Sequence, residues 1–214
     1  QQSGSSAKAV AKAGIVIAHD TRTTSREFAE YVANIISANG CTTYLFESFR
    51  ATPELSFAVR YLHTAAGIVI SASHNPPSDN GFKAYWNDGG QIVPPHDKGI
   101  MEAVGNVQEI KTTSTGEIIQ IGKEVDDAYI AAVANESLSA NRSAIIAYSP
   151  MHGAGITSVQ KVLEYARFKD VTIVQEQATP DGSFPNLPNN IPNPEVETAS
   201  EMVKDYAKRI AADI

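Results

Sequence analysis

The sequence is poor in cysteine and has no long apolar run. Cys41 is the only cysteine among the 214 residues, so no disulfide can form within the chain. Disulfides are rare in reducing compartments, and we therefore expect a cytoplasmic protein. No apolar stretch approaches the roughly 18 residues that a membrane-spanning helix needs, so we expect no membrane partner.

Basic residues are also scarce. The 17 Lys and Arg residues are outnumbered by 24 Asp and Glu residues, which gives a formal net charge of -7. Nucleic-acid-binding proteins carry a basic footprint, so this balance argues against a nucleic-acid partner. The five histidines show no metal-ligand spacing. With 43% hydrophobic and 19% charged residues, the composition is that of an ordinary globular protein.

Short apolar runs alternate with helical patterns in the first half of the chain. The predicted strands lie at residues 14–18, 42–46 and 68–70. One helix is predicted to begin at Thr24, where Thr24 and Glu27 form a capping-box pattern, and another at Thr52, just before a proline. This order predicts a parallel sheet covered by helices. Ligands gather at the carboxyl ends of such strands, where the polar loops 19–24 and 71–80 follow here.

The chain continues with a predicted hairpin and then a second set of strands and helices. The segment Asn87-Asp88-Gly89-Gly90 predicts a turn between strands at 82–86 and 91–93. The elements expected after it are a short helix to about residue 104, a strand at 117–121, a linking helix at 125–137, and strands at 144–148 and 171–174.

A long loop and a last helix complete the pattern. Residues 178–194 are rich in Pro and Asn and include Gly182, and a loop of this length suggests a function. Residues 195–208 are predicted to form a helix. The residues expected to face inward from it are Val196, Ala199, Val203 and Tyr206.

The stretch "SASHNPPSDNGFK", residues 71–83, carries the strongest chemical signal. A hydrolase nucleophile elbow needs Gly on both sides of the serine, and Ser73 has neither. A serine can also carry a phosphoryl group, and His74 and Lys83 lie close to Ser73 in the sequence. The residues alone leave two interpretations open: a phosphoryl-transfer loop, or a capped turn with a solvated His and Lys.

The same stretch closely resembles the active-site region of the α-D-phosphohexomutases, whose signature is (T/S)-x-S-H-N-P followed by N-G-(F/Y)-K. The segments "AHDTRTTS", "YSPMHGAGITSV" and "EQATPDGSFPNLPNNIPNPE" resemble further motifs of that family. The segment "AYWNDGGQIVPPHDKGI" leans towards the phosphopentomutase-like branch. The resemblance implies an α/β fold of two mixed-sheet domains, residues 1–124 and 125–214, where a complete family member has four domains.

The resemblance also implies a mechanism. Ser73 would carry phosphate, donate it to a sugar monophosphate to form a bisphosphate, and take back the other phosphate after the intermediate reorients. Lys83 would be the general acid or base, and His74 would assist the phosphoryl group. Mg²⁺ would bridge the phosphate on Ser73 and three Asp carboxylates, and a sugar bisphosphate would act as activator. The partner would be a phosphorylated sugar.

Two residues are expected to bind substrate or to steady the loops. By resemblance, Arg22 lies in the first-domain D-x-R loop, and an ion pair with Asp20 is an equal alternative for it. Asn75 is expected to hold its loop through bonds from its side chain to the backbone. Both are assigned here as substrate-binding residues.

The sequence departs from the family pattern in two places. The N-terminal G-T-x-G-x-R segment is not found in residues 1–13, and no D-x-D metal motif occurs. We therefore expect a fragment, truncated at both ends and inactive alone. Two other functions stay open: a serine-dependent sugar phosphatase or phosphotransferase, and a non-catalytic sugar-phosphate-binding module.

Overall fold

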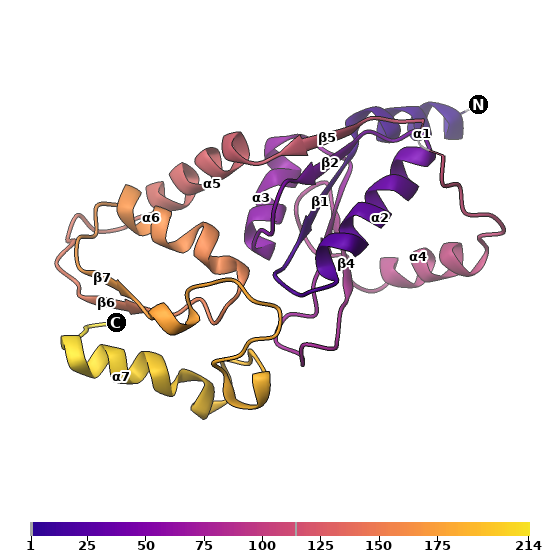
Figure 1. Cartoon of the computed structure of the whole chain (residues 1–214). Coiled ribbons are helices and arrows are strands. Elements are labelled where there is room, and N and C mark those ends of the chain that lie inside the picture. The colour runs from indigo at the N-terminus through magenta and orange to yellow at the C-terminus, as the bar shows by residue number, and fades with distance from the viewer. Residues whose placement is uncertain (1, 114) are drawn as a thin grey trace.

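The computed structural model describes residues 2–113 and 115–214, without the side chains of residues 2–7, and it shows two α/β units (Figure 1). The strands are β1 (Ile15–His19), β2 (Thr43–Phe46), β3 (Ala66–Ile70), β4 (Phe82–Trp86), β5 (Ile118–Ile121), β6 (Ile146–Tyr148) and β7 (Val171–Ile173). The helices are α1 (Gln2–Ala13), α2 (Ser25–Ala38), α3 (Thr52–Tyr61), α4 (His96–Gly105), α5 (Lys123–Asn135), α6 (Val159–Tyr165) and α7 (Glu201–Ile210). Short 3-10 turns lie at Ala154–Thr157, Gln175–Gln177, Pro188–Asn190 and Glu197–Ser200.

The first sheet has five strands in the order β4-β3-β1-β2-β5. Strands β3, β1, β2 and β5 run parallel, and β4 is antiparallel to β3. The inner strands β1 and β3 are buried on both faces, as their continuous apolar sequences indicate. The predicted α/β fold is confirmed. The first sheet is mixed, and the second unit contains the parallel pair β6-β7.

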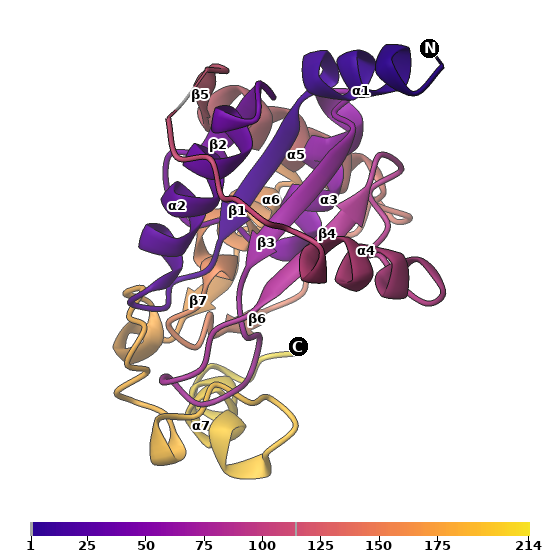
Figure 2. The same ribbon diagram turned by 90° about the vertical axis from the view of Figure 1, so that its right-hand side faces the viewer.

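Helices cover both faces of the first sheet (Figure 2). Neighbouring residues of β1 point to opposite faces, as the pleat of a strand requires. Val16 joins the cluster that contains Leu55 of α3 and Val125 of α5, whereas Ile17 joins the cluster that contains Ala29 of α2. This arrangement places the loops after β1 and β3 at one end of the sheet, towards the second unit (Figure 2).

The predicted capping box at the start of α2 is wrong. Thr24 precedes the helix, but its side chain makes no capping hydrogen bond to it. Thr24 Oγ1 instead accepts a hydrogen bond from Asn80 Nδ2 at 2.9 Å. The side chain of Thr24 therefore binds Asn80 of the loop between β3 and β4 and does not form the capping bond that the local pattern predicts.

The predicted hairpin forms only in part. The chain turns at residues 87–90, with Gly89 at φ +80°, and Trp86 N donates to Gly90 O. The returning arm contributes a single bridge, between Tyr85 and Gln91, rather than a strand. Pro94 and Pro95 follow at once, and proline has no N–H for a sheet.

In the second unit, the predicted helix at 195–208 is in fact a 3-10 turn at Glu197–Ser200 followed by α7. Ala199 is buried as predicted, but Val196 lies before both elements and is 45% exposed, so its predicted inward position is wrong. Ala147 N of β6 also donates to Ile214 O at 2.9 Å.

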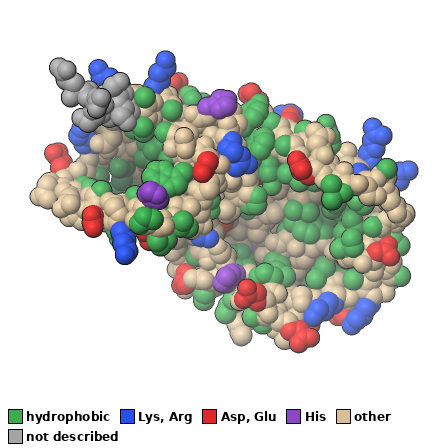
Figure 3. Space-filling model, turned by 180° about the vertical axis from the view of Figure 1, so that it is seen from behind, with side chains coloured by type: hydrophobic (Ala, Val, Ile, Leu, Met, Phe, Trp, Pro, Cys, Tyr) green, Lys and Arg blue, Asp and Glu red, His purple; other side chains and the backbone are tan. Residues whose placement is uncertain are grey.

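Two further features are the character of the helices and the distribution of surface charge. None of the helices in the described part of the chain has the length and apolar character to cross a membrane. On the face shown in Figure 3, acidic and basic side chains are interspersed, and neither sign covers a large area.

Candidate functional site

Ser73 lies on the loop that joins β3 to β4. Ser71 N donates to Gly81 O at 2.9 Å and closes the base of this loop. A Cβ on Gly81 would lie 2.7 Å from Ser71 O, so only glycine allows this approach. Because β4 runs antiparallel to β3, with Lys83 opposite Val69, the chain returns Lys83 towards the loop it has just left.

The structure brings Ser73 and Lys83 together. Lys83 Nζ donates a hydrogen bond to Ser73 Oγ. Ser73 has φ +54°, a conformation that side-chain-bearing residues adopt rarely, and its N–H donates to Ser71 Oγ at 3.0 Å. The side chain of Ser73 is exposed, so a ligand can reach Oγ.

His74 and Asn75 follow Ser73 on the exposed part of the loop. None of the hydrogen bonds between described residues involves the side chain of His74. Asn75 Nδ2 donates to Asp79 Oδ2 at 3.2 Å, so the expected bond from its side chain to the backbone is wrong. The same loop is held through its main chain, because Asn75 N donates to Ala72 O at 3.1 Å.

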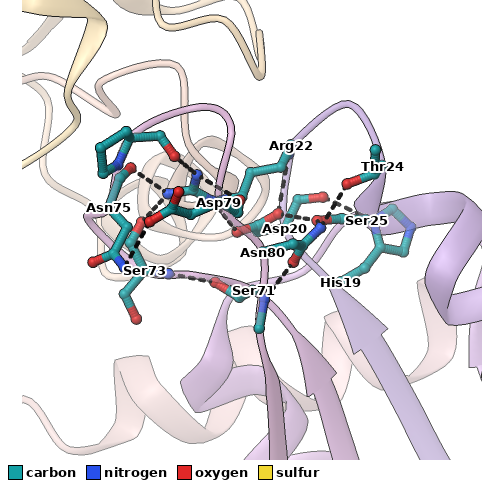
Figure 4. A network of polar contacts seen from close by, with 12 residues as sticks. His19, Asp20, Arg22, Thr24, Ser25, Ser71, Ser73, Asn75, Asp79 and Asn80 are labelled. Carbon is teal, nitrogen blue, oxygen red and sulfur yellow. Dashed lines mark hydrogen bonds and ion pairs between the residues drawn. The ribbon is translucent and has the colours of Figure 1, made fainter.

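Arg22 clamps the Ser73 loop from the neighbouring loop after β1 (Figure 4). Its side chain is 1% exposed, and its guanidinium donates to four main-chain carbonyls and one carboxylate. These acceptors are Ser73 O at 3.0 Å, Asn75 O at 2.7 Å, Pro76 O at 2.6 Å, Asp79 O at 3.1 Å and Asp20 Oδ2 at 3.2 Å.

A guanidinium has five N–H donors, and all five of Arg22 are used within the protein. These donors position the loop, so two of the roles expected for Arg22, steadying the loop and pairing with Asp20, are both present. Its assignment as a substrate-binding residue stays a prediction.

Asn80 joins the two loops at their other side (Figure 4). Its Nδ2 donates to Ser25 Oγ at 3.0 Å, and its Oδ1 accepts from Gly81 N at 2.8 Å. Ser25 Oγ in turn donates to Asp20 Oδ1 at 2.5 Å. The loop that carries Ser73 is thus fixed at both sides to the end of β1 and the start of α2.

A cavity of about 390 Å³ lies beside Ser73, between the two units. The first unit contributes Ser71, Ser73 and Arg50, and the second contributes Tyr148 and Phe184, among others. Burial raises the pKa of Tyr148 to about 12, so this phenol keeps its proton at neutral pH. The cavity therefore offers hydroxyl groups beside the serine that the sequence singled out.

Arg50, Tyr148 and Phe184 were missed as site residues at the sequence level. Arg50 lies between β2 and α3, where nothing in the local pattern marks it. Tyr148 ends a short strand and has the pattern of a core residue. The only available signal for Phe184 was its position in the long loop 178–194, for which a function was expected.

A buried acidic pair holds Arg50 at the edge of the cavity. Arg50 binds Asp126 of α5 through two hydrogen bonds, of 2.7 and 2.8 Å, and its Nε lies 3.7 Å from Glu54 Oε1. Burial alone would raise the pKa of Asp126, but the bonds and charge of Arg50, together with Glu54 and Lys161, outweigh it, and the pKa lies below its ordinary value. Burial and then the neighbouring Asp126 raise the pKa of Glu54 to about 8.

The Asp ligands of the implied Mg²⁺ site are expected outside these 214 residues, because the sequence has no D-x-D motif. In the stretches 2–113 and 115–214, no group of three or more His, Cys, Asp or Glu side chains could hold a metal ion. Asp20, which lines the cavity beside Ser73, is already engaged by Arg22 and Ser25. The residues present therefore do not form a Mg²⁺ site by themselves.

Comparisons with known proteins match nearly the whole chain. Two family models match, "Phosphoglucomutase/phosphomannomutase, alpha/beta/alpha domain I" over residues 2–111 and "domain II" over residues 127–214. A "Probable phosphomannomutase" of Haemophilus influenzae is 37% identical over 207 residues, which are 93% of this chain and 42% of that protein. A "Probable phosphoribomutase" of Schizosaccharomyces pombe is 36% identical over 212 residues, 92% of this chain and 35% of that protein.

A solved structure supports the fold. A phosphoglucomutase/phosphomannomutase family protein from Burkholderia thailandensis matches with a TM-score of 0.77 at 22% identity. The match covers 98% of this chain and 44% of the Burkholderia chain. The chain therefore spans roughly two fifths of the length of the relatives that it matches. The domain boundary after residue 124 and the branch within the group stay predictions.

Proposed function

Because this chain belongs to the phosphoglucomutase/phosphomannomutase family, we propose that it moves a phosphoryl group between two hydroxyls of a phosphorylated sugar, with Ser73 as the carrier. The observation that carries the proposal is the hydrogen bond from Lys83 Nζ to Ser73 Oγ beside the cavity between the two units. The chain is short against its relatives, so the proposal concerns the protein at its natural length, and the 214 residues alone are expected to be inactive.

In the proposed transfer, the bond from Ser73 Oγ to phosphorus breaks and a bond from a sugar oxygen to phosphorus forms. The ammonium of Lys83 would donate a proton to the departing Oγ and then take the proton that the sugar hydroxyl loses. The second transfer runs in the opposite direction, from the other sugar phosphate to Ser73. The net result is a sugar phosphate isomer, through a bisphosphate intermediate.

The neighbouring residues would assist by position. His74 is exposed next to Ser73 and is free to donate to the phosphoryl oxygens. Asn75, also exposed, would face the substrate while its carbonyl stays bound to Arg22. The family resemblance implies Mg²⁺ as a charge screen, but the described carboxylates do not form its site, so no step is assigned to it.

The test is transfer of labelled phosphate. The protein at its natural length is incubated with glucose 1,6-bisphosphate labelled with ³²P and with Mg²⁺, and phosphoserine, sugar isomers and inorganic phosphate are measured. We expect a label on Ser73 that is lost in Ser73→Ala and kept in Ser78→Ala, an exposed serine on the same loop.

Two results would contradict the proposal. An equal label in Ser73→Ala and wild type would remove Ser73 as the carrier. Release of inorganic phosphate without sugar isomerisation would identify a phosphatase instead.

A further inference from the structure

We propose that Gly182 and Phe184, on the long loop of the second unit, are positioning residues for Ser73. They contact Arg22, and Arg22 holds the loop that carries Ser73. The inference rests on the proposed function only for its effect on catalysis, since the contact itself can be tested without activity.

Gly182 brings the two units together backbone to backbone. A Cβ on Gly182 would lie 2.6 Å from Thr23 N, 2.7 Å from Arg22 Cα and 2.7 Å from Thr21 O. These are main-chain atoms, which cannot move aside as the end of a flexible side chain can. The long loop therefore reaches the loop after β1 only because residue 182 has no side chain.

Phe184 covers one face of the Arg22 guanidinium. The guanidinium carbon lies 5.3 Å from the centre of the Phe184 ring, and the ring is buried, at 2% exposure. The edges of the same guanidinium carry the bonds to the Ser73 loop. Arginine is suited to this arrangement, because a flat guanidinium stacks on an aromatic face and donates hydrogen bonds in its own plane.

The two residues belong to one compact turn. Phe184 N donates to Asp181 O at 3.1 Å, and Ser183 N and Oγ both donate to Asp181 Oδ1. These bonds lower the pKa of Asp181, which stays ionised and keeps the turn closed. A rigid turn of the second unit is thus placed against the side chain that fixes the first unit's loop.

The consequence is a direct route from the second unit to Ser73. Arg22 Nη2 donates to Ser73 O and to Asn75 O, at 3.0 and 2.7 Å. A guanidinium that loses the Phe184 ring is free to tilt, and its carbonyl partners then lose their fixed positions. The hydroxyl of Ser73 would still be present but held less well relative to Lys83.

A purely structural role for Phe184 is the rival explanation, and the chain offers a control for it. Phe184 packs in a buried cluster with Leu187 and Ala199. Leu187→Ala removes a buried side chain from the same cluster. Within the described part of the chain, Leu187 hydrogen-bonds to Phe184 and Asn190 and not to Arg22. Leu187→Ala therefore measures the cost of disturbing the cluster alone.

The experiment uses the protein at its natural length, with Phe184→Leu, Phe184→Tyr, Gly182→Ala and Leu187→Ala. Hydrogen exchange of the amides in residues 71–81 reports on the loop, and kcat and KM for the sugar phosphate report on transfer. For Phe184→Leu and Gly182→Ala we expect about tenfold faster exchange in this loop, a kcat lowered by about tenfold or more, and a KM changed less than about threefold. Phe184→Tyr keeps the ring and should behave as wild type.

Other outcomes would overturn the inference. If Leu187→Ala speeds exchange at 71–81 as much as Phe184→Leu does, the effect belongs to the cluster and not to Arg22. If loop exchange in Phe184→Leu equals that of wild type, the contact positions nothing. A wild-type protein without transfer activity would contradict the proposed function, and the exchange comparison would still decide the role of Phe184.

Discussion

We predict that Glu54→Gln abolishes a loss of stability that the wild-type protein shows between about pH 5 and pH 8. Glu54 is 1% exposed, and its Oε2 is buried without a hydrogen-bond partner in the part of the chain that the structure describes. Burial, followed by the neighbouring Asp126, raises its pKa to about 8. A glutamine has nearly the shape of the protonated carboxyl but does not ionise, so it isolates the effect of the proton.

The sign and the size follow from the two pKa values of Glu54. Between the ordinary value of 4.5 and the folded value of about 8, the folded state binds one proton more than the unfolded state. The free energy of unfolding therefore falls by about 1.4 kcal/mol per pH unit as pH rises, a limit of about 4 kcal/mol from pH 5 to pH 8. The stabilising contribution is complete below the ordinary pKa and is lost as pH rises through the folded pKa. Asp126 acts in the opposite direction at lower pH, because its folded pKa is lowered and its contribution is lost only under acid conditions.

Urea unfolding at several pH values measures this difference. Glu54→Gln should be near wild type at about pH 5 and more stable than wild type by a few kcal/mol at about pH 8. Glu47→Gln is the matched control, because Glu47 also lies 3.7 Å from Arg50 but its side chain is 61% exposed. It should shift stability by less than about 1 kcal/mol at any pH. If the difference between Glu54→Gln and wild type were the same at both pH values, Glu54 would not be protonated in the folded protein and the reasoning would fail.

Two further substitutions test the loop around Ser73. Lys83→Met should lower kcat for phosphoryl transfer by about a hundredfold or more, because it removes the proton donor beside Ser73 Oγ; an unchanged kcat would exclude Lys83 as the acid or base. In Gly81→Ala the new Cβ would lie 2.7 Å from Ser71 O, so urea titration should show a loss of about 1–3 kcal/mol in unfolding free energy. Gly99→Ala in α4 meets no atom within 4 Å and should instead gain about 0.5–1 kcal/mol, so equal effects of the two changes would contradict the close approach.

Apart from α1, the elements of the first unit could be predicted because each carries its own signal. For example, an apolar run predicted a strand at residues 42–46, and the structure has β2 at Thr43–Phe46. Helix α1 was not predicted, since Ser and Gly, which favour a helix less than Ala or Gln do, occupy four of its first five positions. The position of β5 at the outer edge, beside β2, depends on pairing across the sheet, and the pattern of one strand says nothing about its neighbours.

The proximity of Ser73 and Lys83 could be predicted from the sequence. Ser73 and Lys83 are ten positions apart on one loop and its returning strand, so a hairpin connection alone brings them together. The full role of Arg22 could not be predicted from the sequence. Most of its acceptors are main-chain carbonyls, and every residue has one. The sequence could offer an ion pair with Asp20 as one role for Arg22, but not the number of loop carbonyls that it would bind.

Contacts between residues far apart in the sequence could not be predicted. Arg50 and Asp126 are 76 positions apart, and nothing in either local pattern indicates the other. Gly182 is the one glycine of the loop at residues 178–194, and its residue type alone points to a turn. Only its distance to the backbone of Thr21–Thr23 shows that it is a point of close contact between the two units. The family resemblance included the loop at residues 178–194 but did not indicate its role. Its contact with Arg22 indicates a role, because Arg22 holds the loop that carries Ser73, and Arg22 is itself held by Gly182 and Phe184 of the second unit.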